Sequence, residues 1–490
     1  MGTVPNWKTK EEHMIKLNEV NTKKQQHIGC RGRTLGDPQN AITLISLVIT
    51  IVILVILAGV AINLTVGENG LLNKAKLAKQ EYNNAVASEE EQLNELYAYL
   101  NADDLPENTK ENPQPLGIPV KLPSKWETTT PNYVSLSDGS VVTKSTKVAS
   151  VYAVSVGEGN TVPIPVGFWY VGGTLDTGVV ISDKEADSYK TNGRDMTSHA
   201  DAINLIGNQF VWIPCTAEEY VKSNWSSDGS QGNITGRSNC YWSTIPDDKG
   251  SMQIEKYEGF YVSRYEAGLP KDTIEFEKSV SSSSNIYNSI EGVPQSKAGV
   301  SPWNFIDWNN SKLKAKKMYE GKTNIASGLI TGTQWDVMIT KIGSLKDENK
   351  NFKYSLTDSA SWGNYYSGYS TTDAFTFRGK VSQYSSSNQY AFKEPDSTTK
   401  KNSTYFLLQT GASEHNLAYN LYDVAGNLWE WTEESAAYYN SIGTLTTNRV
   451  LRGGRFSDPS SVCPASFRDG GCDDTFTHYD VGFRVVLYMK

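Results

Sequence analysis

Residues 422–434 read YDVAGNLWEWTEE, and they are followed by RVLRGGRF at 449–456 and VGFRVVLY at 481–488. Valine, tyrosine, phenylalanine and tryptophan favour extended backbone, and here they alternate with the turn formers glycine, asparagine and aspartate. These stretches therefore predict short strands joined by tight turns. A strand at 429–431 would place both tryptophan side chains on one face and the glutamate between them on the other.

The same composition extends upstream to about residue 126. Short runs of apolar and aromatic residues predict strands, and apolar residues recurring every three or four positions predict two helices. The strands are expected in VPIPVGFWYVGG (162–173), GNQFVWIP (207–214) and YEGFYVSRYEAG (257–268), and the helices around SKLKAKKMYE (311–320) and in GTQWDVMITKIG (332–343). Residues 126–490 are therefore interpreted as one α+β domain.

An uncharged apolar run, ITLISLVITIVILVILAGVAI, occupies residues 42–62. As a helix it is long enough to cross a hydrocarbon layer of about 30 Å. Basic residues gather ahead of it, so the remainder of the chain is expected outside the cytoplasm. The helix should continue as an amphipathic stalk to about residue 100, and the proline-rich residues 101–125 predict a linker.

The stretch AITLISLVITIVIL at the start of this run resembles the N-terminal helix of type IV prepilins and pseudopilins. The resemblance implies cleavage between Ala41 and Ile42, which would make residues 1–41 a leader or cytoplasmic segment and residues 42–100 a pilin-like anchor and stalk. Ala41 and Ser46 depart from the glycine and glutamate that the family prefers. The apolar run itself implies a membrane as a partner, and the resemblance adds pilus subunits as possible partners.

Composition argues against nucleic-acid binding, because the formal net charge is −8 and phosphate binding requires clustered basic residues. The five cysteines include no CxxC pair and no zinc-like spacing with the histidines. Cys463 and Cys472 can form a disulfide or remain two thiols, and the sequence leaves both alternatives open.

Six segments between GFYVSRYEAG and VGFRVVL occur in an order that resembles the domain of formylglycine-generating enzymes and their C-type-lectin-like relatives. The combination of GNLWEW with RGG and GFR carries most of this resemblance. It implies a C-type-lectin fold of the formylglycine-generating-enzyme type after the pilin-like transmembrane helix.

The enzymes of this family require two cysteines, five residues apart, just after the RGG strand. In this chain Asp458 and Cys463 occupy those positions. One thiol cannot provide the paired thiolates of a soft-metal oxygen site. A nucleophilic Cys463 would need a base, and His478 is the candidate in the segment. We therefore expect no oxidase activity.

The resemblance also implies a calcium ion in the GNLWEW loop, held by Asp423 and Glu430 and by the backbone oxygens of Gly426 and Leu428. Oxygen ligands of this kind suit calcium. The alternative is a plain turn in which Asp423 caps and Glu430 accepts hydrogen bonds from buried donors.

Residues 455–480 contain no lysine, glutamate, glutamine, methionine or tryptophan. An asparagine codon whose two adenines are replaced at will never encodes these five amino acids. The segment thus resembles the variable region of proteins diversified by retroelements, which lies between RGG and GFR in the same fold. The alternative is a long polar surface loop.

If the segment is diversified, its side chains form a changeable contact surface on a rigid scaffold. The expected contact residues are Arg455, Ser457, Asp458, Val462, Cys463, Phe467, Asp469, Gly470, Gly471, Cys472, Asp473, Asp474, Phe476, His478, Tyr479 and Asp480. Phe467, Phe476, His478 and Tyr479 would supply its aromatic part.

The favoured function is a surface-displayed binding protein, of receptor or adhesin type, whose target is a protein or glycan on another cell or a phage. Two alternatives are a minor pilin with a structural head and an oxidase-like enzyme. The identity of the target lies in the variable residues and in the partner, so the sequence does not name it.

Overall fold

A computed structural model of the chain forms two compact units, Met1–Glu91 and Gln92–Lys490. It describes residues 105–135, 141–148, 150–184, 195–221, 240–242, 248–366, 379–385, 388–394, 406–439 and 445–490, together with Lys74, Lys76, Lys79 and Gln80. The predicted span 42–62 and the Ala41–Ile42 cleavage site lie outside these residues. Within them, no helix has both the length and the apolar character that crossing a membrane requires.

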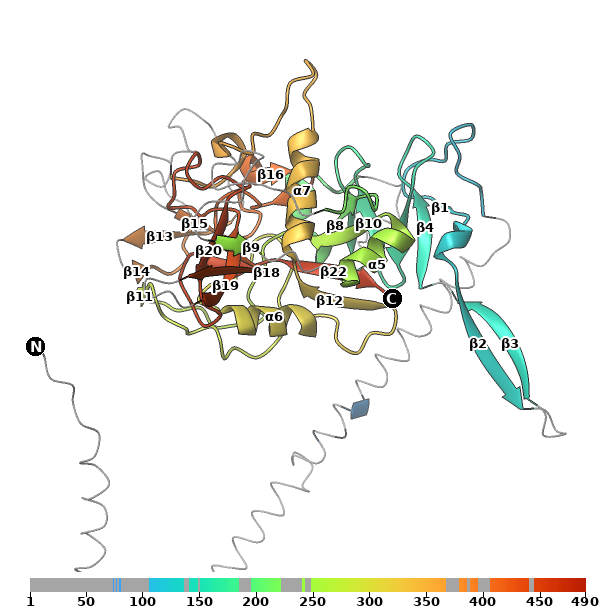
Figure 1. Ribbon diagram of the computed structural model, residues 1–490, viewed down its shortest axis with the longest axis horizontal. Helices are drawn as coiled ribbons and strands as arrows, with labels where there is room; N and C mark the ends of the chain where they lie inside the picture. The colour runs from blue at the N-terminus through green and yellow to red at the C-terminus, as the bar shows by residue number, and fades with distance from the viewer. Residues whose placement is uncertain are drawn as a thin grey trace, which may run out of the picture. The chain divides into compact units, whose positions relative to one another are not determined.

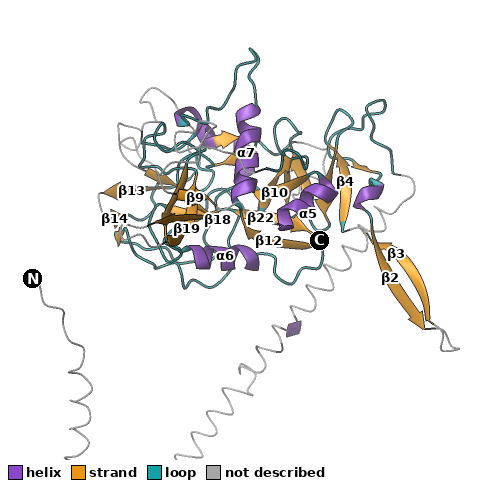
Figure 2. Cartoon of the chain, in the orientation of Figure 1, coloured by secondary structure: helices purple, strands orange, loops and turns teal. Residues whose placement is uncertain are grey.

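Strands dominate the second unit, called the head below (Figure 1). Figure 2 shows the few helices of the head standing against its strands. The strands are β1 (Pro119–Val120), β2 (Thr128–Ser135), β3 (Val141–Val148), β4 (Val151–Ser155), β5 (Thr161–Pro165), β6 (Trp169–Gly172), β7 (Val179–Ser182), β8 (Gln209–Pro214), β9 (Cys240–Trp242), β10 (Gly259–Ser263), β11 (Val280–Ser281), β12 (Ile325–Leu329), β13 (Val381–Ser385), β14 (Asn388–Gln389), β15 (Phe406–Leu408), β16 (Leu417–Ala418), β17 (Leu421–Tyr422), β18 (Trp429–Tyr439), β19 (Leu445–Arg452), β20 (Arg468–Cys472), β21 (Val481–Phe483) and β22 (Val485–Met489). The helices are α4 (His199–Ala202), α5 (Asp248–Tyr257), α6 (Trp308–Lys317) and α7 (Gly332–Ser344), with 3-10 turns η2 (Ser124–Trp126), η4 (Ala360–Trp362) and η5 (Glu414–Asn416).

The largest sheet has the order β12-β22-β10-β8-β7-β6 and is buried on both faces. Successive residues of β8 enter different cores, because Trp212 packs in one apolar cluster and Val211 in the other. Helix α6 belongs to the first cluster and α7 to the second, so the two helices cover opposite faces. Burial on both faces explains why the strand sequences are apolar almost throughout.

A second sheet, in the order β20-β19-β18-β21, carries the GNLWEW motif. Trp429 and Trp431 pack in the same apolar cluster, whereas Glu430 forms an ion pair with the buried Arg484. The predicted separation of the two indoles from the carboxylate is therefore confirmed.

Both predicted helices are confirmed, and their caps set where they begin. Helix α6 starts three residues before the predicted range, because the Asp307 carboxylate accepts a hydrogen bond from the Asn310 N–H at 2.7 Å. Helix α7 starts with a capping box between Thr331 and Gln334.

The prediction of a linker over 101–125 is wrong for residues 105–125. Strand β1 pairs with β4, and the Asn108 side chain donates to the Asn160 carbonyl at 2.8 Å. Trp126 is only 4% exposed. Proline is compatible with this arrangement because Pro119 is the first residue of its strand. The head therefore begins before residue 126.

Candidate ligand-binding face

The segment 455–480 leaves β19, contributes β20 and returns to the sheet at β21, so both of its ends are anchored in one sheet. The RGG motif forms the sharp exit from β19. Gly454 has a φ of +77°, and a Cβ there would lie 2.2 Å from the Cys463 carbonyl oxygen. Only glycine fits this position, which explains the second glycine of the motif.

A buried ion network fixes the base of the segment. Arg468, which lies inside the segment but is 2% exposed, forms ion pairs with Asp336 of α7 and Glu434 of β18. Arg452 of β19 pairs with the same Asp336 at 2.8 Å. Arg468 is thus part of the scaffold rather than of a changeable surface.

The first half of the segment rests on residues 355–366, and we call this supporting stretch the platform. Four hydrogen bonds join the two: Ser460 Oγ to Asp358 Oδ1 (2.6 Å), Ser466 Oγ to the Leu356 carbonyl (2.7 Å), Ala465 N–H to Ser359 Oγ (3.1 Å) and Tyr366 N–H to the Asp458 carbonyl (3.2 Å). The segment contributes to them only backbone groups and the buried side chains of Ser460 and Ser466. The four hydrogen bonds to the platform therefore involve no exposed side chain of the segment.

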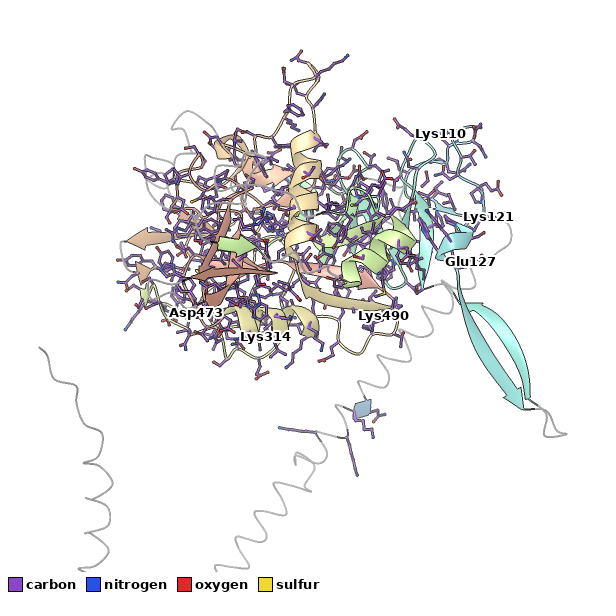
Figure 3. The ribbon with its side chains drawn as sticks, in the orientation of Figure 1. Lys110, Lys121, Glu127, Lys314, Asp473 and Lys490 are labelled. Atoms are coloured by element: carbon purple, nitrogen blue, oxygen red, sulfur yellow. The ribbon has the colours of Figure 1, made fainter. Side chains whose placement is uncertain are left out.

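Most of the expected contact residues lie at least partly on the surface. Val462 is 57% exposed and Asp473 is also exposed. Partial exposure is shared by Arg455, Ser457, Asp458, Cys463, Phe467, Asp469, Gly471, Cys472, Asp474, Phe476 and His478. Figure 3 places Asp473 on the side of the head that carries α6, away from Lys110 and Lys121. These residues form the candidate ligand-binding face.

Three of the expected contact residues, Gly470, Tyr479 and Asp480, are instead buried, and the prediction that they reach a target is wrong. Tyr479 is 3% exposed and packs against Phe456, with ring centroids 6.0 Å apart. Side chains point alternately inward and outward where the chain returns to β21, and this alternation determines which of them are buried. The sequence of a loop does not show which residues point inward.

Phe467 and Phe476 are half-buried rather than freely exposed. The Phe467 ring lies 5.4 Å from the Trp429 ring, and the Phe476 ring lies 6.4 Å from the Trp431 ring. One part of each ring therefore packs in the core, and the other part is exposed at the surface. Sequence reasoning also missed three exposed positions in the segment, Pro459, Ser461 and Thr475.

Arg455 joins the two halves of the segment. Its guanidinium donates to Asp458 at 2.8 Å and to Asp480 at 2.6 Å, and His478 also contacts the Asp480 carboxylate. Burial alone would lower the pKa of Arg455, but the carboxylates of Asp480 and then Asp458 raise it above its usual value. Arg455 remains a cation at every accessible pH.

Asp458 and Cys463 occupy the two positions that are cysteines in an oxidase. Asp458 is an ion-paired carboxylate, and Cys463 is a protonated thiol. Burial, and after it the neighbouring Asp458 carboxylate, raise the pKa of Cys463 well above its usual range. A protonated thiol is a poor nucleophile and a poor metal ligand. No disulfide joins Cys463 to Cys472.

The predicted calcium ligands do not fit an ion, because both side chains already bind protein donors. Both Glu430 oxygens accept hydrogen bonds from Arg484, at 2.6 to 3.1 Å. Asp423 accepts from the Gly411 N–H at 2.7 Å and from Asn416 at 2.8 Å. Within the described residues, no three His, Cys, Asp or Glu side chains are grouped to hold a metal. The arrangement fits the alternative of a plain turn at Asp423, Gly426, Leu428 and Glu430.

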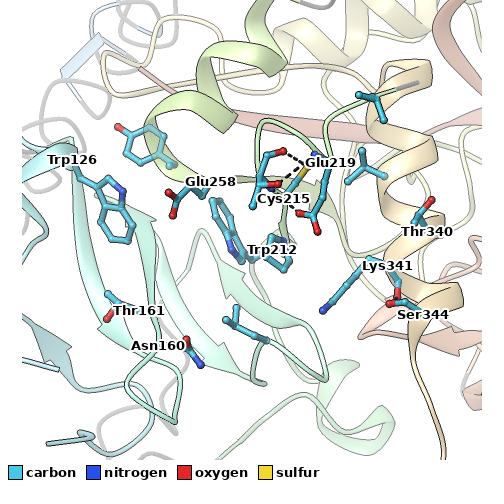
Figure 4. A pocket seen from close by; sticks show the side chains of 16 residues that line it. Trp126, Asn160, Thr161, Trp212, Cys215, Glu219, Glu258, Thr340, Lys341 and Ser344 are labelled. Atoms are coloured by element: carbon cyan, nitrogen blue, oxygen red, sulfur yellow. Dashed lines mark hydrogen bonds between the residues drawn. The ribbon is translucent and has the colours of Figure 1, made fainter. Parts of the chain in front are cut away.

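A groove of about 780 Å³ lies elsewhere in the head, between β8, α5 and α7. Figure 4 shows Lys341 and Ser344 of α7 across from Trp126. Its aromatic residues Trp126, Trp212 and Tyr257 are nearly buried, and burial raises the pKa of its Cys215 thiol to about 12. No histidine is among the described residues that line it. The Cys215 thiol of the groove is therefore held in its protonated, weakly nucleophilic form.

The elements from β10 to β22 include α6, α7 and the segment between RGG and GFR, and together they correspond to a known domain family. Residues 255–489 match the sulfatase-modifying factor enzyme 1-like domain. This match confirms the resemblance of the head to the formylglycine-generating-enzyme type and contains the whole candidate ligand-binding face.

A solved structure, Treponema denticola variable protein 1, is similar over 50% of this chain and 98% of its own length, at 14% identity and a TM-score of 0.23. No curated protein matches the chain.

Proposed function

We propose that the head is a ligand-binding module and that residues 455–480 are its changeable contact surface. The observation that carries this proposal is that different residues of one segment hold the fold and face the solvent. Buried residues such as Ser460 and Arg468 bind the scaffold, whereas the exposed Val462 and Asp473 hold none of the hydrogen bonds to the platform. A surface built in this way can change its side chains without losing its fold.

Diversification by a retroelement is the mechanism that we propose for such change. The absence of five amino acids from residues 455–480 supports it, because adenine replacement in asparagine codons excludes those five. A near-copy of the coding sequence for this segment, differing at adenines and lying beside a reverse-transcriptase gene, is the expected genomic arrangement. Absence of such a copy from the genome would refute this part of the proposal.

The proposed role is binding rather than catalysis. The ion-paired Asp458 and the protonated Cys463 support this choice, because neither supplies the thiolate that oxygen activation requires. Display at a cell surface through residues 42–62, and a protein or glycan on another cell or a phage as the target, remain proposals based on the sequence.

A display library tests the binding role directly. The full-length chain would be displayed on bacterial cells with Ser457, Val462, Asp469, Asp473 and Asp474 randomised, and selected on hen lysozyme as a probe. We expect most unselected members to unfold cooperatively, with melting temperatures close to that of the parent, and selection to yield binders. A library whose members are mostly unfolded, or which gives no binder, would contradict the proposal.

A further inference from the structure

The platform ends at Tyr366, and the residues that precede it are firmly held. Trp362 is 2% exposed and packs edge-on against Tyr354. Asn364 is buried and donates to the Asn427 side chain at 2.8 Å, and the Tyr365 hydroxyl donates to the Gly453 carbonyl at 2.6 Å. The backbone that leads to Tyr366 is therefore fixed by the core and by the RGG turn.

Tyr366 itself is 40% exposed and lies beside the first displayed positions of the segment. Its N–H donates to the carbonyl oxygen of Asp458, at 3.2 Å. A carbonyl oxygen is present whatever side chain stands at 458, so a change of sequence there leaves this contact intact. Tyr366 thus keeps its place next to a surface whose other side chains can differ.

We infer that Tyr366 is a fixed contact residue of the ligand-binding face, which it shares with Ser457, Val462 and the other changeable surface residues of the segment. This inference rests on the proposed function. Tyr366 lies outside residues 455–480, so every variant of the segment carries it. The partner that such a face fits is a folded protein, because the exposed side chains of Val462, Asp473 and Tyr366 combine apolar, charged and aromatic groups, as protein interfaces do.

Tyrosine suits a constant contact for physical reasons. Its ring offers a large apolar area with only two side-chain torsions to immobilise, and its hydroxyl can donate or accept a hydrogen bond. Aromatic residues of this type contribute most of the binding energy at many protein interfaces. One fixed anchor would give each new variant a base affinity to which the changed side chains add specificity.

Lysozyme binders selected from the library provide the test. Tyr366→Ala would be introduced into several independent binders, and the dissociation constant measured by biolayer interferometry. We expect affinity to fall about 10-fold or more in most of them, since truncation of an aromatic anchor has an effect of this size. Tyr366→Phe should retain most of the affinity if the ring area dominates.

Phe352 is the matched control, because it is an exposed aromatic residue, at 69%, just before the platform. It pairs with Lys346 beyond the end of α7. Phe352→Ala should change affinity less than 2-fold, and all three substitutions should leave the melting temperature nearly unchanged. If Tyr366→Ala changes affinity no more than Phe352→Ala does, the inference is wrong while the proposed function stands. A library without binders would overturn both.

Discussion

Glu430 shows at the scale of one residue how the head accommodates buried charge. Its carboxylate is fully buried and bound by Arg484, and Glu266 lies in the same region, where its side chain accepts hydrogen bonds from Asn427 and the Leu428 N–H. Burial is the largest influence on Glu430 and raises its pKa from 4.5 to about 7, although Arg484 acts in the opposite direction. Burial likewise raises the pKa of Glu266.

This residue predicts a stability that falls as the pH rises. A carboxyl whose pKa is higher in the folded state than in the unfolded state binds more protons when folded. Its stabilising contribution is complete below pH 4.5 and is lost as the pH rises through about 7. We expect the free energy of unfolding, measured by urea denaturation, to decrease between pH 5 and pH 8.

Glu430→Gln provides the control for this prediction, because an amide does not titrate. The variant should show a weaker decrease over the same pH range, although loss of the ion pair with Arg484 lowers its stability above about pH 7. A free energy of unfolding that increases from pH 5 to pH 8 in the parent chain would show that Arg484, and not burial, governs Glu430.

The turn from Asp423 to Glu430 is an element whose side chains are satisfied by protein groups alone. An ion that bound it would stabilise the fold by RT ln(1 + [L]/Kd), and its removal would lower the melting temperature. Because Asp423 and Glu430 already accept hydrogen bonds from Gly411, Asn416 and Arg484, we expect no such effect. Calorimetry in 2 mM calcium, which is about 2 to 20 times the Kd of a typical extracellular calcium module, and in a chelator checks this. A clear loss of stability in the chelator would contradict it.

Strand β1 and turn η2 predict where the head can be cut. A chain that begins at residue 105 keeps β1, whereas one that begins at Ser124 loses it and uncovers β4. Val120, which is 1% exposed, would also be lost from the core. We expect the shorter chain to melt at a lower temperature in thermal scans, because burying one such side chain contributes about 1.5–3 kcal/mol. Equal melting temperatures of the two chains would show that the head begins near residue 126 after all.

The sequence predicted the elements whose pattern is local. The apolar run of β8 and the apolar periodicity of α7 are visible in a few neighbouring residues, so both elements were expected. The attachment of residues 105–125 was not expected, because proline-rich composition describes a linker and an edge strand equally well. Tyr366 was not found for a different reason. Its contact with Asp458 joins positions far apart in the sequence, and only the fold brings them together.

At the scale of the whole molecule, the head separates residues that hold the fold from residues that face a partner. The ion network of Arg468 and Arg452 ties the second sheet to α7, and α7 packs on the core of the largest sheet. The displayed side chains lie outside this network, on the face that contains Asp473. Stability and recognition should therefore respond to different substitutions.

The last prediction compares two changes within the same segment. Replacing Val462, Asp469, Asp473 and Asp474 together with alanine, in a chain selected to bind lysozyme, should abolish binding and leave the urea midpoint nearly unchanged. Substitutions at the surface typically alter stability by no more than about 0.5 kcal/mol each. The hydrogen bonds lost here are local to the turns, where Asp469 accepts from the Gly471 N–H and Asp473 accepts from Thr475. Arg468→Ala should lower the urea midpoint, because it leaves Asp336 and Glu434 buried with one partner fewer. Breaking a buried ion pair in this way costs about 3–5 kcal/mol. If the fourfold variant unfolds, or if Arg468→Ala is as stable as the parent, then scaffold and contact surface are not separate in this segment, and a face that changes freely is not possible.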